Sequence, residues 1–373
     1  SAVGVVSSFI GSLFLFVLLS VVKFICDSYN ECGNLLDVFT SGVPDLHFSE
    51  LSVCWSLDHT SVSCVMMVSI CGFLCVSYCS NYYPSYVSFN YGLNLVIRVF
   101  LFFMLALVLS GSMYTTLFCW DGVSIVSFCL ILFYGDAISM RAGLISIFFG
   151  RLGDVALMFL FAVVEYHGCY VEGVVAGLLA VIAVFTKSSF MPFCSWLLEA
   201  MNAPMPVSAL VHSSTIVVCG VWLCLKYNAY MGVSLNGSVT APGSLSQGPS
   251  GFEMCLIVGS LATIFGSALC GLFYKDLKKL IALSTQATIG WCALFLGYGL
   301  VSVSVSLLLV HAVSKCMLFL SVGNVSSSWQ GSYKSTNSMV SQCVNSDWKN
   351  SGYSGIIFGL TGFPYFGVFW CKV

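Results

Sequence analysis

The sequence predicts an all-α, polytopic membrane protein. Of its 373 residues, 58% are hydrophobic and only 8% are charged, whereas a soluble globular domain carries about 25% charged residues. So few charges cannot cover a soluble protein of this size, but they suffice where most of the surface faces lipid. The apolar runs are continuous and too long for the alternating strands of a membrane barrel. Helices, which pair their own backbone polar groups, are therefore expected.

Windows of about 20 apolar residues, the length that crosses a bilayer, predict about eleven transmembrane helices. The expected spans are distributed along the whole chain, at residues 3–25, 59–80, 93–111, 113–134, 144–166, 173–191, 206–226, 253–273, 279–298, 301–322 and 354–371.

Polar stretches between these spans suggest how the chain is divided. Residues 1–58 comprise the first span and an acidic loop, and residues 59–373 form one transmembrane domain. Within this domain, residues 228–251 are rich in Gly, Ser and Pro, and residues 323–353 are rich in Ser, Asn and Gly. Both stretches are expected to be polar loops, because these residue types favour turns over regular structure.

Composition and motifs argue against several classes of site. The net charge of −2 argues against nucleic-acid binding, and neither nucleotide-binding glycine motif occurs. The 19 cysteines include no C-x-x-C pair, so neither a metal nor a cofactor is expected on this chain. Cys71, Cys75 and Cys79 follow i, i+4 spacing on one helix face, where they are expected as small apolar side chains. A metal site on that face is the alternative.

Ionisable residues inside the expected spans carry most of the functional information. A charged side chain at the bilayer centre costs about 2.5–3.5 kcal/mol on insertion scales, and it is tolerated where it faces a polar interior and has a partner. Such residues are functional candidates. They are Asp121, Arg151, Asp154, Lys187, His212, His311, Lys315 and Lys372.

Spacing within helices pairs some of these candidates. Arg151 and Asp154 lie one turn apart, as do His311 and Lys315, so the members of each pair share a helix face. The Arg151–Asp154 pair is expected either in a proton path or as a fixed bridge that orients helices. His212 is either a hydrogen-bonded structural residue or, because histidine titrates near neutral pH, a proton carrier.

Two prolines predict interruptions of the helices that carry lysines. Pro192 follows Lys187 by five residues and frees the carbonyl of Ser188, which would place unpaired backbone groups beside the lysine. Pro364 removes the bond to Leu360 in the last expected span. Broken helices at buried ion sites recur in transporters. Together with titratable groups on successive helices, these breaks predict a proton path across the bilayer.

Longer motifs around these residues resemble one family. Residues 186–201 (TKSSFMPFCSWLLEAM) resemble the signature K-S-A-x-x-P-x-x-x-W-L-P-x-A-M, and residues 203–212 (APMPVSALVH) resemble P-T-P-V-S-A-L-x-H. This signature is that of the antiporter-like subunits of respiratory complex I and of the Mrp-type cation/proton antiporters. Residues 150–154 (GRLGD) are similar to N-R-x-G-D, which favours the subunit 5 branch of the family.

The resemblance continues to the end of the chain. Residues 275–285 (KDLKKLIALST) match D-[IL]-K-K-x-x-A-x-S-T, residues 311–315 (HAVSK) resemble H-A-x-x-K-A-L-L-F, and residues 362–372 (GFPYFGVFWCK) resemble G-x-P-x-x-x-G-F-x-S-K. The similarity therefore extends from about residue 58 to the C-terminal residue. It implies an antiporter-like fold with two broken helices, near Pro192 and Pro364.

The resemblance also implies roles for the candidates. Asp121 stands where the family has the glutamate of its proton path, in W-[ED]-G, and Lys187 matches the lysine of the first broken helix. His212 matches a linking histidine, from which His311 and Lys315 continue the path. Lys372 matches the lysine of the second broken helix. In this family, quinone reduction elsewhere in the complex drives pumping, so flavin, iron–sulfur clusters and quinone are expected on other subunits and no redox chemistry on this chain.

The chain departs from the family pattern at several positions. Asp121 is one methylene shorter than the usual glutamate, which shortens its reach to Lys187. Leu307 stands where many members have an additional histidine. The family continues after Lys372 with an acidic residue, more helices and a lateral helix, which would here be absent, disordered or supplied by a separate chain.

Three functions stay open at this point. The first is a proton-pumping subunit of NADH:ubiquinone oxidoreductase in the mitochondrial inner membrane. Its partners would be other membrane-arm subunits, above all a subunit 4-like neighbour, and membrane lipids such as cardiolipin. The second is an Mrp-type cation/proton antiporter subunit in a bacterial plasma membrane. The third is a structural membrane-arm subunit that no longer pumps.

Overall fold

Long apolar helices make up most of the part of the chain that the structure describes. This structure is a computed structural model, and it describes residues 55–56, 58–82, 87–167, 174–227 and 251–328. The helices, in chain order, are α3 (His59–Tyr82), α4 (Val87–Leu109), α5 (Met113–Ile131), the 3₁₀ turn η1 (Leu132–Tyr134), α6 (Ala137–His167), α7 (Val174–Lys187), α8 (Ser195–Ala200), α9 (Met205–Leu210), the π-helical turn η2 (Val211–Thr215), α10 (Ile216–Lys226), α12 (Gly251–Phe273), α13 (Leu277–Gly297) and α14 (Val301–Ser328).

Most expected spans within the described residues correspond to long helices. Eight helical segments of this part of the chain are long and apolar enough to cross a membrane. The expected span at 173–191 is different, because α7 ends at Lys187 and its apolar part, Gly177–Lys187, is shorter than a crossing helix. The expected spans 3–25 and 354–371 lie outside the described residues, so the expected total of about eleven is not established.

Two expected loop boundaries differ from the structure. The polar loop expected at 323–353 begins later, because α14 continues to Ser328. The sequence that follows Gly323 is polar but contains no proline before residue 328, so it ends the apolar span without ending the helix. Similarly, α12 already begins at Gly251, the last residue of the other expected loop.

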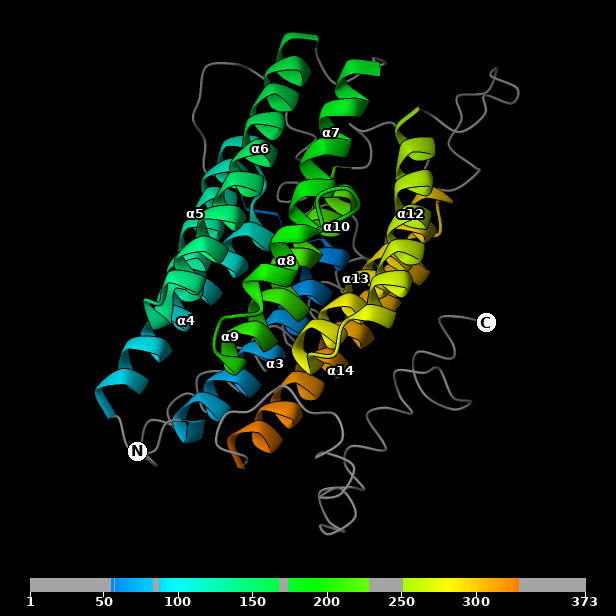
Figure 1. The fold of residues 1–373 in the computed structure, drawn as a ribbon. Helices are drawn as coiled ribbons and strands as arrows, with labels where there is room; N and C mark the ends of the chain where they lie inside the picture. The colour runs from blue at the N-terminus through cyan, green and yellow to red at the C-terminus, as the bar shows by residue number, and fades with distance from the viewer. Residues whose placement is uncertain (1–54, 57, 83–86, 168–173, 228–250, 329–373) are drawn as a thin grey trace.

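Eight helices form a closed ring. Along the chain α3 packs on α4, α4 on α5, α5 on α6 and α6 on α7, and the series continues from α7 to α12, α13 and α14. Helix α14 returns to pack against α3 and closes the ring. Figure 1 shows α4, α5 and α6 together on one side, α12, α13 and α14 together on the other, and α10 between the two groups.

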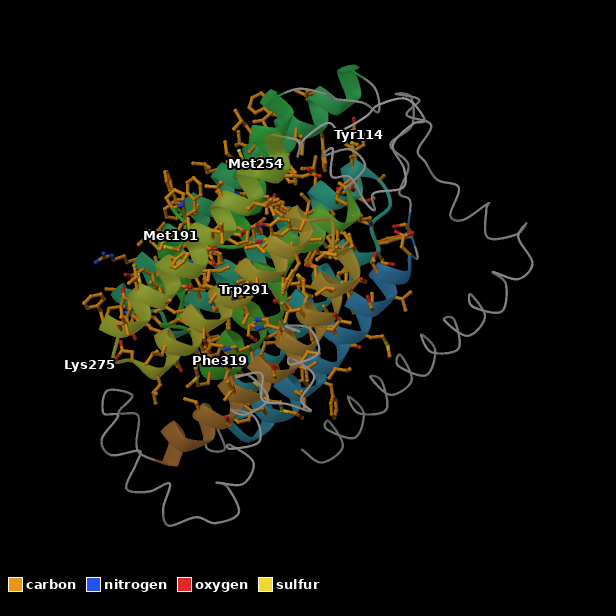
Figure 2. The ribbon with its side chains drawn as sticks, turned by 90° about the vertical axis from the view of Figure 1, so that its right-hand side faces the viewer. Tyr114, Met191, Met254, Lys275, Trp291 and Phe319 are labelled. Carbon is orange, nitrogen blue, oxygen red and sulfur yellow. The ribbon has the colours of Figure 1, made fainter. Side chains whose placement is uncertain are left out.

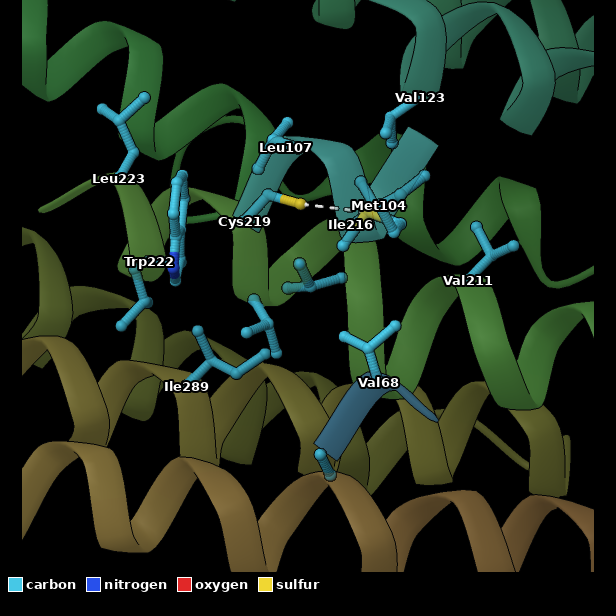
Figure 3. Packing of buried hydrophobic residues seen from close by; sticks show 14 of the residues in the cluster. Val68, Met104, Leu107, Val123, Val211, Ile216, Cys219, Trp222, Leu223 and Ile289 are labelled. Carbon is cyan, nitrogen blue, oxygen red and sulfur yellow. Dashed lines mark hydrogen bonds between the residues drawn. The ribbon is translucent and has the colours of Figure 1, made fainter. Parts of the chain in front are cut away.

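The centre of the ring is the continuous segment α9–η2–α10. Its span, Met205–Lys226, is 100% buried inside the described chain, whereas the other seven candidate membrane spans of the described residues are between 28% and 61% buried. Figure 3 shows how it is enclosed: Ile216, Cys219 and Trp222 meet side chains that include Met104 of α4 and Ile289 of α13. The Sγ atom of Cys219 lies 3.5 Å from the Sδ atom of Met104. No face of this segment is left for lipid.

The outer surface of the ring is apolar. Large side chains are exposed there on α4, α5, α6 and α12, namely Phe102, Phe118, Phe148 and Phe265. Exposed phenylalanine on several helices is typical of a surface that faces lipid. Figure 2 shows that Tyr114, near the start of α5, and Lys275, which follows α12, lie at opposite ends of the bundle. The chain is therefore a membrane protein with an enclosed central segment.

Candidate functional site

Lys187 is the last residue of α7 and points into the interior of the ring. The residue is 4% exposed, and its Nζ atom lies close to groups on α5 and α6. It donates a hydrogen bond to the hydroxyl of Ser124 on α5, and it lies 4.7 Å from the ring centroid of Trp120 on the same helix. An ammonium group over an indole face is stabilised by the negative face of the ring.

The carboxylate that faces this lysine is Asp154 of α6. Its Oδ1 atom lies 3.9 Å from the Nζ atom of Lys187 and accepts a hydrogen bond of 2.8 Å from the indole nitrogen of Trp120. Trp120 therefore contacts both members of the ion pair and fixes the carboxylate beside the ammonium group. Both charged residues are buried, so their charges are compensated mainly by each other and by these polar neighbours.

Arg151 extends this cluster outward. Its guanidinium lies 3.4 Å from the other oxygen of Asp154 and also forms a close ion pair with Asp121. The side chains of Arg151 and Asp121 are 48% and 43% exposed. The order across the helices is thus Asp121, Arg151, Asp154 and Lys187. Asp121 was expected beside Lys187, but it contacts Arg151 instead, because Asp154 occupies the inner position.

A glycine in the N-R-x-G-D-like motif allows this approach of α6 to α7. A methyl group added at Gly153 would overlap the hydroxyl of Thr186, the residue before Lys187. A second glycine, Gly220 of α10, lies similarly close to the side chain of Ser188. Small residues at helix crossings let backbones approach in membrane proteins. Both glycines therefore bring neighbouring helices against the end of α7.

The backbone is interrupted directly after Lys187. Helix α7 ends there and α8 begins at Ser195, with Pro192 in the non-helical segment between them. Pro192 was expected to free the carbonyl of Ser188, and two other carbonyls at the end of α7 and in the break accept hydrogen bonds from side chains. The indole nitrogen of Trp196 donates to the carbonyl of Thr186 at 2.9 Å, and the amide of Gln286 on α13 donates to that of Ser189 at 2.8 Å.

His212 lies in the π-helical turn η2 and is fully buried. The hydroxyls of Ser214 and Thr215 both bond to the carbonyl of Leu210, at 3.0 and 2.9 Å, and these bonds compete with regular helical pairing. The imidazole ring lies 6.1 Å from the indole of Trp196. The backbone of Ala200 is close enough to interact with the ring, but neither nitrogen makes a hydrogen bond of normal geometry with the described residues.

A cavity of about 30 Å³ joins Lys187 and His212. That volume is enough for about two water molecules. Its wall includes hydroxyl groups from three helices as well as the two titratable side chains, and its polar lining residues are Ser124, Ser127, Ser146, Thr186, Lys187 and His212. Most of the cavity wall is apolar, so these few side chains are the hydrogen-bond partners that water would have there. Lys187 and His212 thus border the same cavity.

His311 and Lys315 share one face of α14, as their spacing predicts, and both are buried. This face meets α13. The Nδ1 atom of His311 lies 2.7 Å from the hydroxyl of Thr288, and the ammonium of Lys315 donates to the hydroxyl of Ser284 at 2.5 Å. The sequence did not single out these hydroxyls, although Ser284 lies within the motif of residues 275–285 and Thr288 follows it by less than one helical turn. Two further candidates, Lys372 and Pro364, lie outside the described residues.

The cysteine stripe on α3 is buried among apolar residues. Cys71, Cys75 and Cys79 each have an exposed fraction of 0%. The Sγ atom of Cys75 lies 3.5 Å from that of Cys316 on α14, so the stripe forms part of the contact that closes the ring. Within the described part of the chain, no group of three or more His, Cys, Asp or Glu side chains is arranged to hold a metal ion.

Comparisons with known proteins identify the family of the chain. The family model described as NADH:quinone oxidoreductase/Mrp antiporter, TM, matches residues 110–373. The chain is 32% identical over 306 residues to NADH-ubiquinone oxidoreductase chain 5 of Anopheles arabiensis, covering 78% of this chain and 75% of that protein. It is 33% identical over 296 residues to the protein of the same name in Caenorhabditis elegans, covering 78% and 53%. The chain thus spans about half the length of some relatives, including that of Aedes aegypti, at 53%.

Two solved structures of membrane complexes contain a similar fold. A chain of the Mrp complex from Dietzia sp. DQ12-45-1b superposes with a TM-score of 0.62 at 26% identity, over 73% of this chain and 30% of that chain. A chain of the membrane-bound sulfane sulfur reductase, an archaeal respiratory membrane complex, superposes with a TM-score of 0.69 at 18% identity, over 87% and 67%. At 18% identity, the similarity to the sulfane sulfur reductase chain concerns the fold alone. On the evidence of the family model and the curated relatives, the chain belongs to the NADH:quinone oxidoreductase/Mrp antiporter transmembrane family, as a divergent relative of NADH-ubiquinone oxidoreductase chain 5.

Proposed function

We propose that this chain translocates protons as a membrane-arm subunit of complex I in the mitochondrial inner membrane. Quinone reduction on other subunits, which hold the flavin and the iron–sulfur clusters, supplies the energy, and this chain performs no redox chemistry. Its relationship to NADH-ubiquinone oxidoreductase chain 5 supports the assignment to that complex.

One observation carries the proposal. The ammonium of Lys187 lies at an interrupted helix in the interior of the ring, 3.9 Å from the Asp154 carboxylate, and the lysine lines a cavity that His212 also lines. Lys187 thus has a carboxylate that stabilises its protonated form and a cavity into which it could release the proton. A proton carrier requires both. A lysine that only joined helices would need the carboxylate but not the cavity.

The ion pairs suggest how loading and release alternate. A carboxylate close to Lys187 favours its ammonium form, and removal of that carboxylate weakens the hold on the proton. Asp154 has a second cationic partner, since Arg151 lies 3.4 Å from its other oxygen. A movement of Asp154 towards Arg151 would release the proton of Lys187 into the cavity and on to His212. From there His311 and Lys315, and then Lys372 on the second interrupted helix near Pro364, continue the path.

The decisive variant is Lys187→Met, measured in the assembled complex. Lys226→Met is a matched control, because Lys226 is another lysine at the end of a helix, with its Nζ atom 4.8 Å from the ring of Trp222. We expect Lys187→Met to abolish most proton translocation coupled to NADH oxidation, and Lys226→Met to preserve it. Equal translocation in both variants would favour a structural subunit. Proton-linked sodium transport by the chain without redox subunits would favour the Mrp-type function.

The outer ion pair supports a protein neighbour. Arg151 and Asp121 lie near the middle of their spans, and their side chains are about half exposed within the described residues. Charges at this depth are costly against lipid and are tolerated against protein or water. We therefore place a membrane-arm neighbour, of the subunit 4 type, over this part of α5 and α6, with cardiolipin among the surrounding lipids. An Asp121→Cys thiol should resist a lipid-soluble maleimide in the assembled complex and react in the isolated chain.

A further inference from the structure

Helix α7 ends earlier than its proline requires. A proline can end a helix at the residue before it, so Pro192 alone would let α7 continue to Met191. The helix nevertheless ends at Lys187, and residues 188–191 contain neither proline nor glycine. A feature other than the proline therefore fixes the end of the helix, and with it the position of Lys187.

The backbone of Ser189 ends the helix. Its φ angle is 55°, in the left-handed region, and within the described part of the chain it is the one residue other than glycine with a positive φ. The N–H group of Phe190 donates to the carbonyl of Phe185 at 2.9 Å. A left-handed residue followed by a bond of this reach is the Schellman motif, a common C-terminal cap of α-helices. Glycine usually holds the left-handed position, because this conformation is unfavourable for other residues.

Two phenylalanine side chains close this cap. The ring centroids of Phe185 and Phe190 lie 5.0 Å apart, which is the apolar contact that often accompanies a Schellman motif. Both side chains are buried. A methyl group added at Gly259 of α12 would overlap the aromatic ring of Phe185, so this ring packs directly against α12. The cap is therefore fixed to a neighbouring helix as well as to α7.

Gln286 of α13 bonds to the left-handed residue itself. Its amide nitrogen donates to the carbonyl of Ser189 at 2.8 Å, and the glutamine is 1% exposed. This carbonyl lies beyond the end of α7, where regular helical pairing no longer supplies a donor. The Ser189 hydroxyl is also buried, but it bonds to none of the described residues. The contacts at position 189 thus depend on its backbone and not on its hydroxyl.

The same helix also holds the far end of the interrupted segment. The ammonium of Lys278, in the first turn of α13, donates at 3.0 Å to the carbonyl of Ala203, which lies between α8 and α9. Lys278 and Gln286 are about two turns apart on α13. Helix α13 therefore donates to backbone carbonyls on both sides of α8 and supports the whole interruption.

The cap fixes the backbone of Lys187, which is the last residue of α7. From this position its Nζ atom lies 3.9 Å from Asp154 and bonds to the hydroxyl of Ser124. The carbonyls at a helix end need partners, so loss of the cap would free the last turn of α7. The ammonium would then sample positions further from the carboxylate.

We infer that Ser189 and Gln286 are positioning residues for Lys187. The left-handed backbone of Ser189 ends α7 at the lysine, and the amide of Gln286 holds that backbone in place. This inference deepens the proposed function and rests on it for the role of Lys187 in transport. Neither residue carries the proton itself.

The first experiment separates the backbone of residue 189 from its side chain. Thermal unfolding of the full chain in lipid nanodiscs is measured for Ser189→Gly, Ser189→Ala and Ser189→Val. We expect Ser189→Gly to melt at or above the temperature of the original chain, because glycine adopts a positive φ freely. Ser189→Ala should melt close to the original, since the hydroxyl has no partner among the described residues. Ser189→Val should melt lower, because a β-branched residue strongly disfavours this conformation.

The order of these variants decides whether the cap is correct. A Ser189→Gly variant that melts below Ser189→Val would overturn the left-handed cap. So would a large loss in Ser189→Ala, because the hydroxyl would then carry the effect.

The second experiment asks whether Gln286 acts through Lys187. Leucine in Gln286→Leu has a similar volume but cannot donate, and its effect on unfolding is measured in the original chain and in Asp154→Asn. If Gln286 positions the lysine, loosening the cap also weakens the ion pair. The melting temperature should then fall less in the Asp154→Asn background. Equal shifts in the two backgrounds would show independent sites and overturn the positioning role.

Transport rates in the assembled complex provide the functional readout. Gln286→Leu leaves a buried carbonyl without its donor, and we expect it to slow coupled proton translocation about tenfold. Thr285→Val is the matched control, because the Thr285 hydroxyl is buried in the same helix and bonds to the carbonyl of Ala282 at 2.7 Å. This control should keep the original rate. Unchanged translocation in Gln286→Leu would overturn the inference.

Lys187→Met tests the proposed function separately. If Lys187→Met leaves translocation intact while the Ser189 variants unfold in the expected order, the proposed function fails and the cap stands. If Lys187→Met abolishes translocation while Gln286→Leu does not change it, the proposed function stands and the positioning role of Gln286 fails.

Discussion

Lys187 of α7 and Asp154 of α6 face each other in the interior of the ring, with Nζ 3.9 Å from Oδ1. Trp120 contacts both of them, through its indole nitrogen and through its ring face. Asp154 is therefore the carboxylate that faces the lysine at the helix break. Asp121 corresponds in sequence to the family's glutamate, but it pairs with Arg151, on the side of the arginine that faces away from Lys187.

Asp154→Asn should impair proton translocation more than Asp121→Asn. The first change leaves a buried ammonium beside a neutral amide, and breaking a buried ion pair costs about 3–5 kcal/mol. We expect a loss of at least about tenfold in coupled pumping. Asp121→Asn leaves Arg151 paired with Asp154 and leaves Lys187 beside its carboxylate. Pumping rates of the two variants in the assembled complex provide the comparison, and a larger loss in Asp121→Asn would contradict this order.

Gly153→Ala should destabilise the contact between α6 and α7. The added methyl group would overlap the hydroxyl of Thr186, and overpacking of this kind costs about 1–3 kcal/mol. Thermal unfolding in detergent measures the effect. Gly150→Ala is the control, since it lies one turn away in the same helix and a methyl group there meets no atom within 4 Å. Equal melting temperatures of the two variants would contradict the close approach.

Trp196→Phe should weaken the interrupted segment after α7. The indole nitrogen donates to the carbonyl of Thr186, and a buried carbonyl without a partner costs about 1–3 kcal/mol. The remaining phenyl ring still packs near His212. Trp291→Phe serves as the control, because Trp291 is exposed on α13. Thermal stability of the full chain should fall in the first variant only, and stability equal to that of the control would refute the role of this bond.

Ser124→Ala should slow translocation, whereas Ser127→Ala should not. Both serines lie on α5 and line the same cavity, and the Ser127 hydroxyl bonds to the carbonyl of Ser124 at 2.7 Å. Only the Ser124 hydroxyl contacts Lys187. Loss of one hydrogen bond to a charged group predicts a change of about tenfold. Similar rates in both variants would show that the cavity, and not this acceptor, determines the rate.

Much of the site follows from motifs, because the family signature surrounds the residues that the fold buries. Lys187 and His212 line one cavity, and His311 and Lys315 share a face as their spacing predicts. The sequence did not predict that Asp154, and not Asp121, is the carboxylate that faces Lys187. It depends on how α5 and α6 are rotated about their axes, and hydrophobic patterns specify this rotation poorly when the helices are apolar on most sides.

The local backbone was harder to predict than the helices. Residues 173–191 read as one apolar span, yet the helix ends at Lys187 and a non-helical segment follows it. Likewise, residues 206–226 contain a π-helical turn around His212. Hydropathy is insensitive to both features, because the residues in the break and in the turn are as apolar as those of a regular helix or carry only small hydroxyls. The Ser and Thr residues that follow His212 were the one sequence feature that could have indicated an irregular helix there.

The enclosed segment Met205–Lys226 also constrains biogenesis. It leaves the ribosome after α3–α7 and before α12–α14, so when it is synthesised three of the eight ring helices do not yet exist. Until α14 reaches α3, one flank of this segment must be shielded by lipid or by an insertion chaperone. A nascent chain arrested before α12 should therefore be a preferred substrate for membrane quality control, and stalling at that point should expose His212 to degradation machinery that never meets it in the finished protein.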